Sequence, residues 1–88
     1  MITCQVGKIV IGKIHGSRHT KDKRIKLTGF KKRPKMVVAL KQYGQLDGYS
    51  GVFFDLKVKS PTYAVISAFG FGGKPAEQVE ASYVACGN

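Results

Sequence analysis

Apolar and polar residues alternate with a period of two along several stretches of this chain, and this pattern limits the fold more than any other feature. The segment from 52 to 59 alternates almost completely, with apolar residues at Val52, Phe54, Leu56 and Val58. Because successive side chains of a strand point to opposite faces, this segment predicts a strand with one buried face. No stretch carries apolar residues at helical spacing over the length a helix needs. The sequence therefore predicts an all-β chain.

Five other segments predict strands, and turns rich in glycine and proline separate them. They span residues 9–11, 23–27, 35–40, 63–69 and 77–85. The Ser-Pro-Thr turn at residues 60–62 closes a hairpin. Further inward-facing positions are expected at Ile25, Leu27, Val79, Ala81, Tyr83 and Ala85. Six short strands predict one antiparallel β-sandwich domain over residues 1–88, with a small barrel as the alternative.

Two of the predicted strands, residues 9–11 and 35–40, have apolar residues at successive positions and so on both faces. This is typical of strands that are covered on both sides. In a sandwich the opposite sheet covers only one side, so the second apolar side suggests a contact between subunits. A chain of 88 residues buries a modest core. Oligomerisation is therefore the expected supplement to its stability, and a disulfide is the competing one.

The only cysteines, Cys4 and Cys86, lie near opposite ends of the sequence. Free buried thiols are the expected state. A bridge is the alternative if the first and last strands are neighbours, and it would contribute roughly 4 to 5 kcal/mol. Two thiols without nearby ligand pairs do not make a zinc site, and His15 and His19 are four residues apart without a helical context. No metal and no cofactor are expected.

The net charge of +10 is concentrated in the first half of the chain. Residues 1–41 hold twelve lysines and arginines against one acid, whereas residues 42–88 hold three lysines against four acids. Eight of the cations form a predicted basic patch: Lys21, Lys23, Arg24, Lys26, Lys31, Lys32, Arg33 and Lys35. Such a cluster attracts polyanions, so nucleic acid, an anionic glycan, a teichoic-acid-like polymer or an acidic protein are the expected partners. The alternative is a solvated basic face that serves solubility.

Groups suited to catalysis are sparse. The five acids are scattered, so no general acid and base are paired, and no nucleophile has an evident base. The glycine-rich segment 70–74 lacks the spacing of a phosphate loop, and Pro75 replaces the required Ser or Thr. The sequence predicts a binding domain and not an enzyme. Since no signal peptide is evident and no apolar run approaches ~20 residues, we expect synthesis in a cytoplasm and no membrane insertion.

One loop combines the side chains that sugar sites prefer, namely aromatic rings beside amide, carboxylate and hydroxyl groups. It lies between residues 43 and 51. With two residues of the first turn, the candidate ligand-binding set is Tyr43, Gln45, Asp47, Tyr49, Arg18 and His19. An ordinary polar hairpin loop is the alternative.

Four segments, in this order, are similar to a known family. Residues 25–30 are Ile-Lys-Leu-Thr-Gly-Phe, and residues 33–40 are Arg-Pro-Lys-Met-Val-Val-Ala-Leu. After a long gap, residues 58–65 are Val-Lys-Ser-Pro-Thr-Tyr-Ala-Val, and residues 83–87 are Tyr-Val-Ala-Cys-Gly. The chain thus resembles the H-type lectin domain and the related C-terminal domains of phage tail fibres. In that family the final aromatic is often Trp, and here it is Tyr83.

The resemblance implies a six-stranded antiparallel sandwich that forms trimers with sugar sites near the subunit contacts. The leading hypothesis is a homotrimeric structural or receptor-binding domain of a phage virion, made in the host cytoplasm, that binds an anionic cell-surface glycan. One alternative is a virion assembly protein whose partners are other virion proteins. The other is a basic β-barrel that binds nucleic acid through Arg18, Lys21, Lys23, Arg24, Lys31, Lys32 and Arg33.

Overall fold

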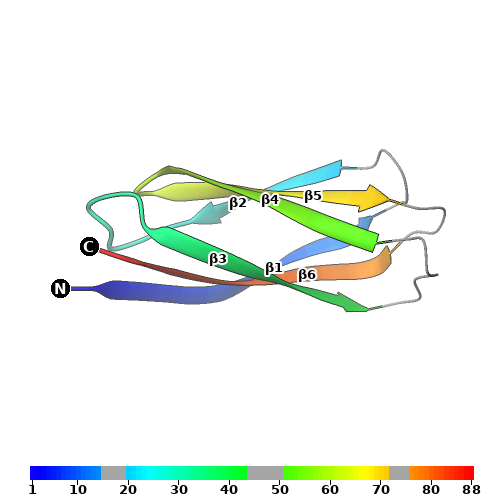
Figure 1. Ribbon diagram of the computed structural model, residues 1–88, viewed down its shortest axis with the longest axis horizontal. Coiled ribbons are helices and arrows are strands. Elements are labelled where there is room, and N and C mark those ends of the chain that lie inside the picture. The colour runs from blue at the N-terminus through cyan, green and yellow to red at the C-terminus, as the bar shows by residue number, and fades with distance from the viewer. Residues whose placement is uncertain (15–19, 44–50, 72–75) are drawn as a thin grey trace.

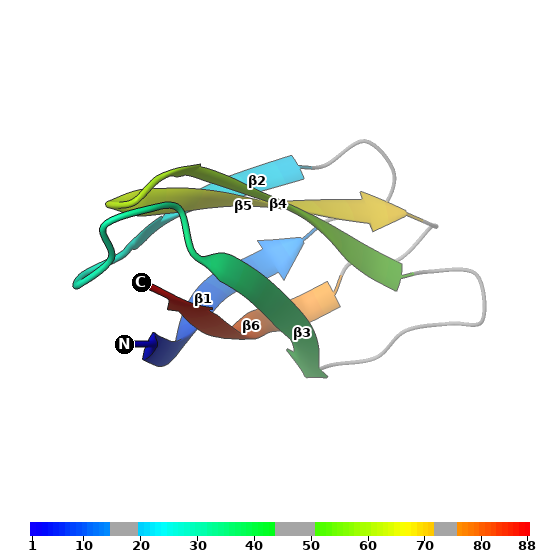
Figure 2. The same ribbon diagram turned by 60° about the vertical axis from the view of Figure 1, so that its left-hand side comes forward.

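The computed structural model describes residues 1–14, 20–43, 51–71 and 76–88, which form two three-stranded antiparallel sheets. The first sheet has the order β1 (Thr3–Ile14), β6 (Ala76–Gly87), β3 (Lys35–Tyr43). The second has the order β2 (Thr20–Lys26), β5 (Tyr63–Phe71), β4 (Gly51–Ser60). The sheets lie over one another as two layers (Figure 1). Both chain termini and the connection from β2 to β3 lie together at one end of the strands, here called the terminal end (Figure 2).

All six predicted strands are confirmed, and β1 differs most from its predicted bounds. It begins at Thr3, six residues before the apolar run, because its first half pairs with β6 from Gly87 onward. Polar and glycine residues in this half break the alternation that would have predicted a strand. β1 also contains an irregularity at Gly12, whose φ of 91° is a conformation that favours glycine.

The core lies between the two sheets. It is formed by the strand faces that the alternating pattern predicted to be buried. Its buried hydrophobic residues are Ile11, Ile14, Ile25, Leu27, Phe30, Ala64, Ile66, Ala68, Val79, Ala81 and Ala85. The four alanines all lie on β5 and β6, the central strands of the two sheets. Small side chains at the centre leave room for the bulkier ones of β1 and β2, as close packing requires.

The two long sides of this core are covered unequally. On the side of β1 and β2, Ile11, Ile14 and Ile25 are buried. On the side of β3 and β4, the inner-facing apolar residues are only partly buried, and Leu40 is 43% exposed although it pairs with the buried Ala81. The edge between β3 and β4 is therefore the less protected side of the core.

Residues 9–11 and 35–40 are apolar on both faces of their strands, and the side chains on their outer faces are exposed in the isolated chain. Val10 is 58% and Val37 is 65% exposed, and Val6, at 74%, lies in the same row as Val37 across Val84 of β6. No part of the described chain covers these side chains. The sequence predicted a cover on both sides, and the described chain supplies it on one side only. The contact between subunits and the homotrimer therefore stay predictions.

The expectation of free, buried thiols is wrong. Cys4 and Cys86 are directly opposite one another on β1 and β6 and form a disulfide, with their Cα atoms 4.1 Å apart. Cys4 is exposed and Cys86 half-buried, because both side chains lie on the outer face of the first sheet. The alternative raised from the sequence, a bridge between neighbouring first and last strands, is the arrangement found.

The side chain of Gln5 joins the two sheets near the terminal end. Its Nε2 donates hydrogen bonds to the Lys26 carbonyl oxygen (2.8 Å) and to the Tyr83 hydroxyl (3.0 Å), and its Oε1 accepts one from the Thr28 amide (3.0 Å). The Tyr83 ring lies over Gly7, where an added Cβ would be only 2.7 Å from the hydroxyl oxygen. A side chain at position 7 would therefore displace this ring.

We expect Gly7→Ala to lower the free energy of unfolding by about 1 to 3 kcal/mol, the usual cost of inserting a methyl group into a packed contact. The added methyl would displace the Tyr83 ring and weaken its bond to Gln5. Denaturant unfolding measures the effect, with Lys8→Ala, at an exposed neighbouring position, as the control. Equal stability of the two variants would show that the ring moves aside freely.

Candidate anion-binding surface

The cations of β2 are divided between the two sides of the strand. Arg24 and Lys26 point to the outer face of the second sheet, because Ile25 between them is buried in the core. Lys21 and Lys23 have the parity of Ile25 and lie on the other side, where the Lys21 ammonium is close to Gly12 of β1. Two of the eight predicted patch residues are therefore separated from Arg24 and Lys26.

Strand β4 adds two cations that the sequence analysis did not assign to the patch. Lys57 and Lys59 are exposed on the outer face, on either side of the partly buried Val58. Lys57 pairs with Val65 of β5, and Arg24 of β2 pairs with the same Val65. The register thus brings Arg24 and Lys57 into one row across the sheet. Only the pairing of three strands reveals this, since the two residues are far apart in sequence.

The connection from β2 to β3 presents Lys31, Lys32 and Arg33, all exposed, on a backbone that is fixed at several points. The amides of Lys31 and Lys32 donate to the Asn88 carbonyl oxygen at 2.7 and 3.3 Å. The side chain of Phe30 is buried in the core and anchors the same segment. Three cations are therefore held by ordered backbone at the terminal end.

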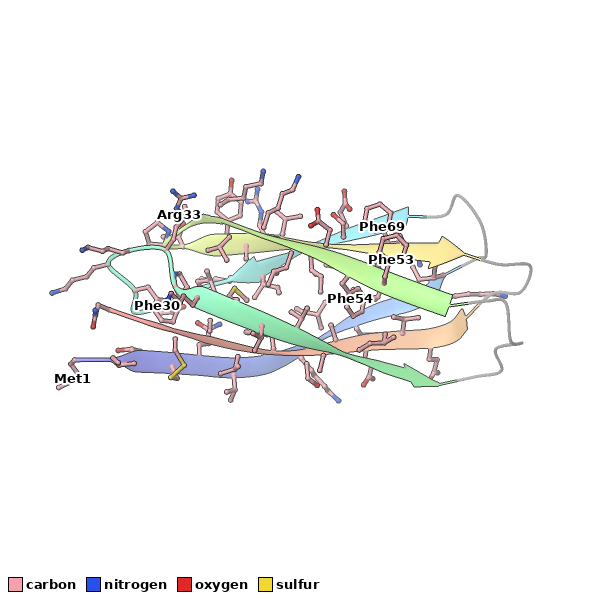
Figure 3. The ribbon with its side chains drawn as sticks, viewed as in Figure 1. Met1, Phe30, Arg33, Phe53, Phe54 and Phe69 are labelled. Atoms are coloured by element: carbon pink, nitrogen blue, oxygen red, sulfur yellow. A yellow bond between two sulfur atoms is a disulfide. The ribbon has the colours of Figure 1, made fainter. Side chains whose placement is uncertain are left out.

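Eight cations gather at or beside the terminal end, and we call this set the basic end. They are Arg24, Lys26, Lys31, Lys32, Arg33, Lys35, Lys57 and Lys59. Arg33, labelled in Figure 3, lies close to the turn between β4 and β5. Within the described residues, the ion pair recorded for this set joins Lys57 Nζ to Asp55 Oδ2 at 3.9 Å, and both side chains are more than half exposed. An exposed pair at this distance contributes little, so the positive charge of the basic end is largely uncompensated.

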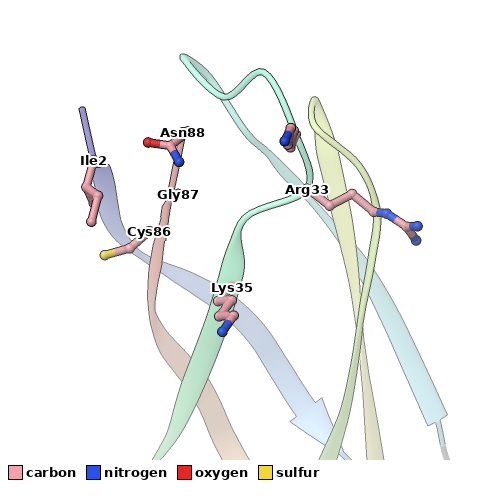
Figure 4. A pocket seen from close by; sticks show the side chains of 7 residues that line it. Ile2, Arg33, Lys35, Cys86, Gly87 and Asn88 are labelled. Carbon is pink, nitrogen blue, oxygen red and sulfur yellow. The ribbon is translucent and has the colours of Figure 1, made fainter.

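A pocket of about 480 Å³ opens at the basic end. Its lining residues are Ile2, Lys32, Arg33, Lys35, Cys86, Gly87 and Asn88. The Arg33 guanidinium is directed away from Gly87 and Asn88, toward the second sheet, as Figure 4 shows. Lys35 lies in one row with Cys86 on the outer face of the first sheet. The pocket offers ammonium groups and no carboxylate side chain, which suits an anionic group.

The outer face of the second sheet carries rows of different side-chain chemistry, one after another along the strands. Phe69 and Phe53 form a row toward the end of the strands opposite the terminal end, with ring centroids 5.0 Å apart and planes inclined by 16° (Figure 3). The next row holds Asp22, Ser67 and Asp55. The row after that holds Arg24, Val65 and Lys57, and the Arg24 guanidinium lies 4.2 Å from the centroid of the Tyr63 ring in the following row. Aromatic, acidic and basic rows thus follow one another toward the terminal end.

Most of the candidate sugar-binding residues lie outside the described part of the chain. These are Arg18, His19, Gln45, Asp47 and Tyr49, and His15 lies outside that part as well. Tyr43 is the last residue of β3, where its backbone pairs with Gln78 of β6. The structure therefore does not test whether these side chains lie together, and the sugar-binding loop stays a prediction.

The described residues contain no cluster of three or more metal-ligating side chains. Likewise, no helix in the part of the chain that the structure describes has the length and apolar character to cross a membrane. The chemistry that the described surface offers is electrostatic and aromatic. No protein-family model matches the chain, and a search of curated proteins finds no match to it.

Proposed function

We propose that this chain is a binding domain for an anionic polymer of the cell surface, a glycan by class, and that the basic end is its binding surface. The observation that carries the proposal is the gathering of eight cations from β2, β3, β4 and one ordered connection at or beside one end of the two layers. Lys35 lies on the outer face of the first sheet, and the cations that β2 and β4 contribute lie on the outer face of the second. Such a surface raises the local concentration of a polyanion and contacts several of its charges at once.

The setting that we propose is a phage virion, in which the chain serves as a homotrimeric H-type-lectin-like β-sandwich of the tail. Two layers of three antiparallel strands agree with the sandwich that the resemblance implies. The exposed Val6, Val10 and Val37 support association with further copies, since apolar rows of this kind favour burial. The Cys4–Cys86 disulfide supports a role in an oxidising environment, such as a virion surface.

Nucleic acid is the second candidate, because the same cations would contact phosphates. Proteins that bind single strands usually stack several bases on aromatic rings. Among the described residues of the basic end, Tyr63 offers an aromatic ring on the outer face of the second sheet. The Arg24 guanidinium already lies over this ring, 4.2 Å from its centroid. The surface therefore supports charge attraction better than base stacking, and the glycan remains the first candidate.

The test is a binding titration of the full chain with an anionic glycan, a neutral glycan and a random oligonucleotide. We expect the triple variant Lys31→Gln, Lys32→Gln, Arg33→Gln to bind the anionic glycan about 10- to 100-fold more weakly, since each exposed ion pair contributes roughly 0.5 to 1 kcal/mol. Wild-type binding should weaken steeply as salt rises from about 0.05 to 0.5 M, because screening shortens the range of the attraction.

The matched control removes the same charge elsewhere, through Lys8→Gln, Lys21→Gln and Lys23→Gln. We expect this variant to bind nearly as well as the wild type, because none of its three positions belongs to the basic end. Equal weakening by both variants would indicate attraction by net charge without a defined surface. Tighter binding to the oligonucleotide than to every glycan would contradict the proposal in favour of nucleic acid, and binding to none of the three would leave a virion assembly role.

A further inference from the structure

We propose that the outer face of the second sheet binds a zwitterionic segment of the surface polymer, with an ammonium group over Ser67 and an anionic group over Val65. Asp22 and Asp55 flank the first position, and Arg24 and Lys57 flank the second. This inference rests on the proposed function and deepens it, because it names a class of polymer that carries both charges. The four charged side chains are exposed.

The acidic row is the feature that binding of a purely anionic polymer leaves unexplained. The whole chain has only five acids, and two of them stand in one row directly beside the cations of the basic end. Asp55 contacts Lys57 only at 3.9 Å, and no ion pair is recorded for Asp22 within the described residues. Both carboxylates would repel a polyanion that runs along β5. A ligand with a positive group at this row would turn the repulsion into attraction.

The register sets the spacing of charges that such a ligand needs. Residues two apart on one strand are separated by about 6.6 to 6.8 Å, and neighbouring strands by about 4.8 Å. An ammonium over Ser67 thus lies one strand spacing from the backbone of Asp22 and of Asp55. Its anionic neighbour should lie roughly 7 Å away along β5. The ligand class that fits is therefore a polymer with amino groups on a phosphate or uronate backbone, with an ammonium and an anionic group at about this separation.

The aromatic row supplies a second contact for the positive group. Phe53 is 53% exposed and stacks on Phe69 in the row next to Ser67. Ring faces attract cations, and ligands with an ammonium group commonly use aromatic rings for this reason. An ammonium over Ser67 would therefore lie between a pair of carboxylates and beside a pair of phenyl rings. Both contacts select for positive charge.

A second copy of the chain is the competing occupant of this face. Two copies related by a twofold axis between the acidic and basic rows would place Asp22 over Arg24 and Asp55 over Lys57. The net charge of +10 on each copy opposes such contact through a face that also carries Lys26 and Lys59. The more apolar exposed surface lies elsewhere, on β1 and β3. These charges favour a ligand over a copy.

The experiment compares one polymer in two forms: a teichoic acid bearing D-alanyl esters, and the same sample after mild alkaline hydrolysis, which removes the ammonium groups and keeps the phosphates. We expect the wild type to bind the alanylated form about 10-fold more tightly. The double variant Asp22→Asn, Asp55→Asn should lose this preference and bind the hydrolysed form more tightly than the wild type does. Glu80→Gln, on the first sheet, is the control and should keep the wild-type ratio.

The outcomes separate this inference from the proposed function. Binding of both polymers with a ratio that the double variant leaves unchanged would overturn the zwitterionic site while the anionic-polymer function stands. Binding of neither polymer would overturn both. The oligomeric state of the wild type and of each variant is also measured, by light scattering. If the double variant dissociates an oligomer that the wild type and Glu80→Gln form, the face is an interface between copies and the inference is wrong.

Discussion

Loss of the Cys4–Cys86 disulfide is expected to lower the free energy of unfolding by about 4 to 5 kcal/mol. The bond joins residues separated by 82 positions, so its removal frees nearly the whole chain in the unfolded state. For a loop of this length the chain-entropy model gives about 4.5 kcal/mol. Since a domain of this size has a total stability of roughly 5 to 10 kcal/mol, the loss would leave it marginal. Urea unfolding with and without reductant measures the change.

The double variant Cys4→Ser, Cys86→Ser controls for other effects of the reductant. It should match the reduced wild type, and reductant should change it no further. Both sulfurs lie on the outer face of the first sheet, so the two serines would remain at a solvent-accessible surface. A wild type whose midpoint is unaffected by reductant, with the thiols shown to be free, would contradict the expected contribution of the bridge.

Truncation of Ile66 to Ala should cost about 2 to 5 kcal/mol. Ile66 lies at the centre of β5, is 0% exposed and belongs to the core cluster between the sheets. Its neighbours in that layer, Ala64 and Ala68, are too small to fill the cavity that the substitution leaves. Chemical unfolding of the oxidised protein gives the difference in stability.

Val65→Ala is the matched control, because Val65 is the next residue of the same strand and faces the opposite side. It is only half-buried, so we expect a loss below about 1 kcal/mol. Equal losses at the two positions would mean that β5 does not separate a buried inner face from an outer face, and the two-layer arrangement would be contradicted.

The strands could be predicted because alternation is a local property of the sequence. Ile25 and Val58 were placed on inner faces by parity alone, and both lie against or within the core. The first half of β1 was missed because Gln5 and Gly7 interrupt that parity. Gln5 points inward to hydrogen-bond the other sheet, and Gly7 makes room for a ring. These are tertiary reasons that no local pattern contains.

The candidate site could be predicted only in part. The run from Lys31 to Arg33 is visible in the sequence, and the structure holds it at the terminal end. Lys57 was not assigned to the patch because it is separated from Arg24 by more than thirty residues and becomes its row neighbour only through β5. The cysteines illustrate the same limit, since their state depended on whether β1 and β6 are neighbours.

The most direct test of the central claim is to map the contact itself, by following backbone amide shifts of the ¹⁵N-labelled protein as a short anionic glycan is added. The account predicts that the largest shifts occur at the basic end, in residues 24–26, 31–35 and 57–59, and that they disappear at high salt. The contradicting result would be saturable shifts confined to residues 43–51, the loop with the candidate sugar-binding side chains, with the basic end unchanged.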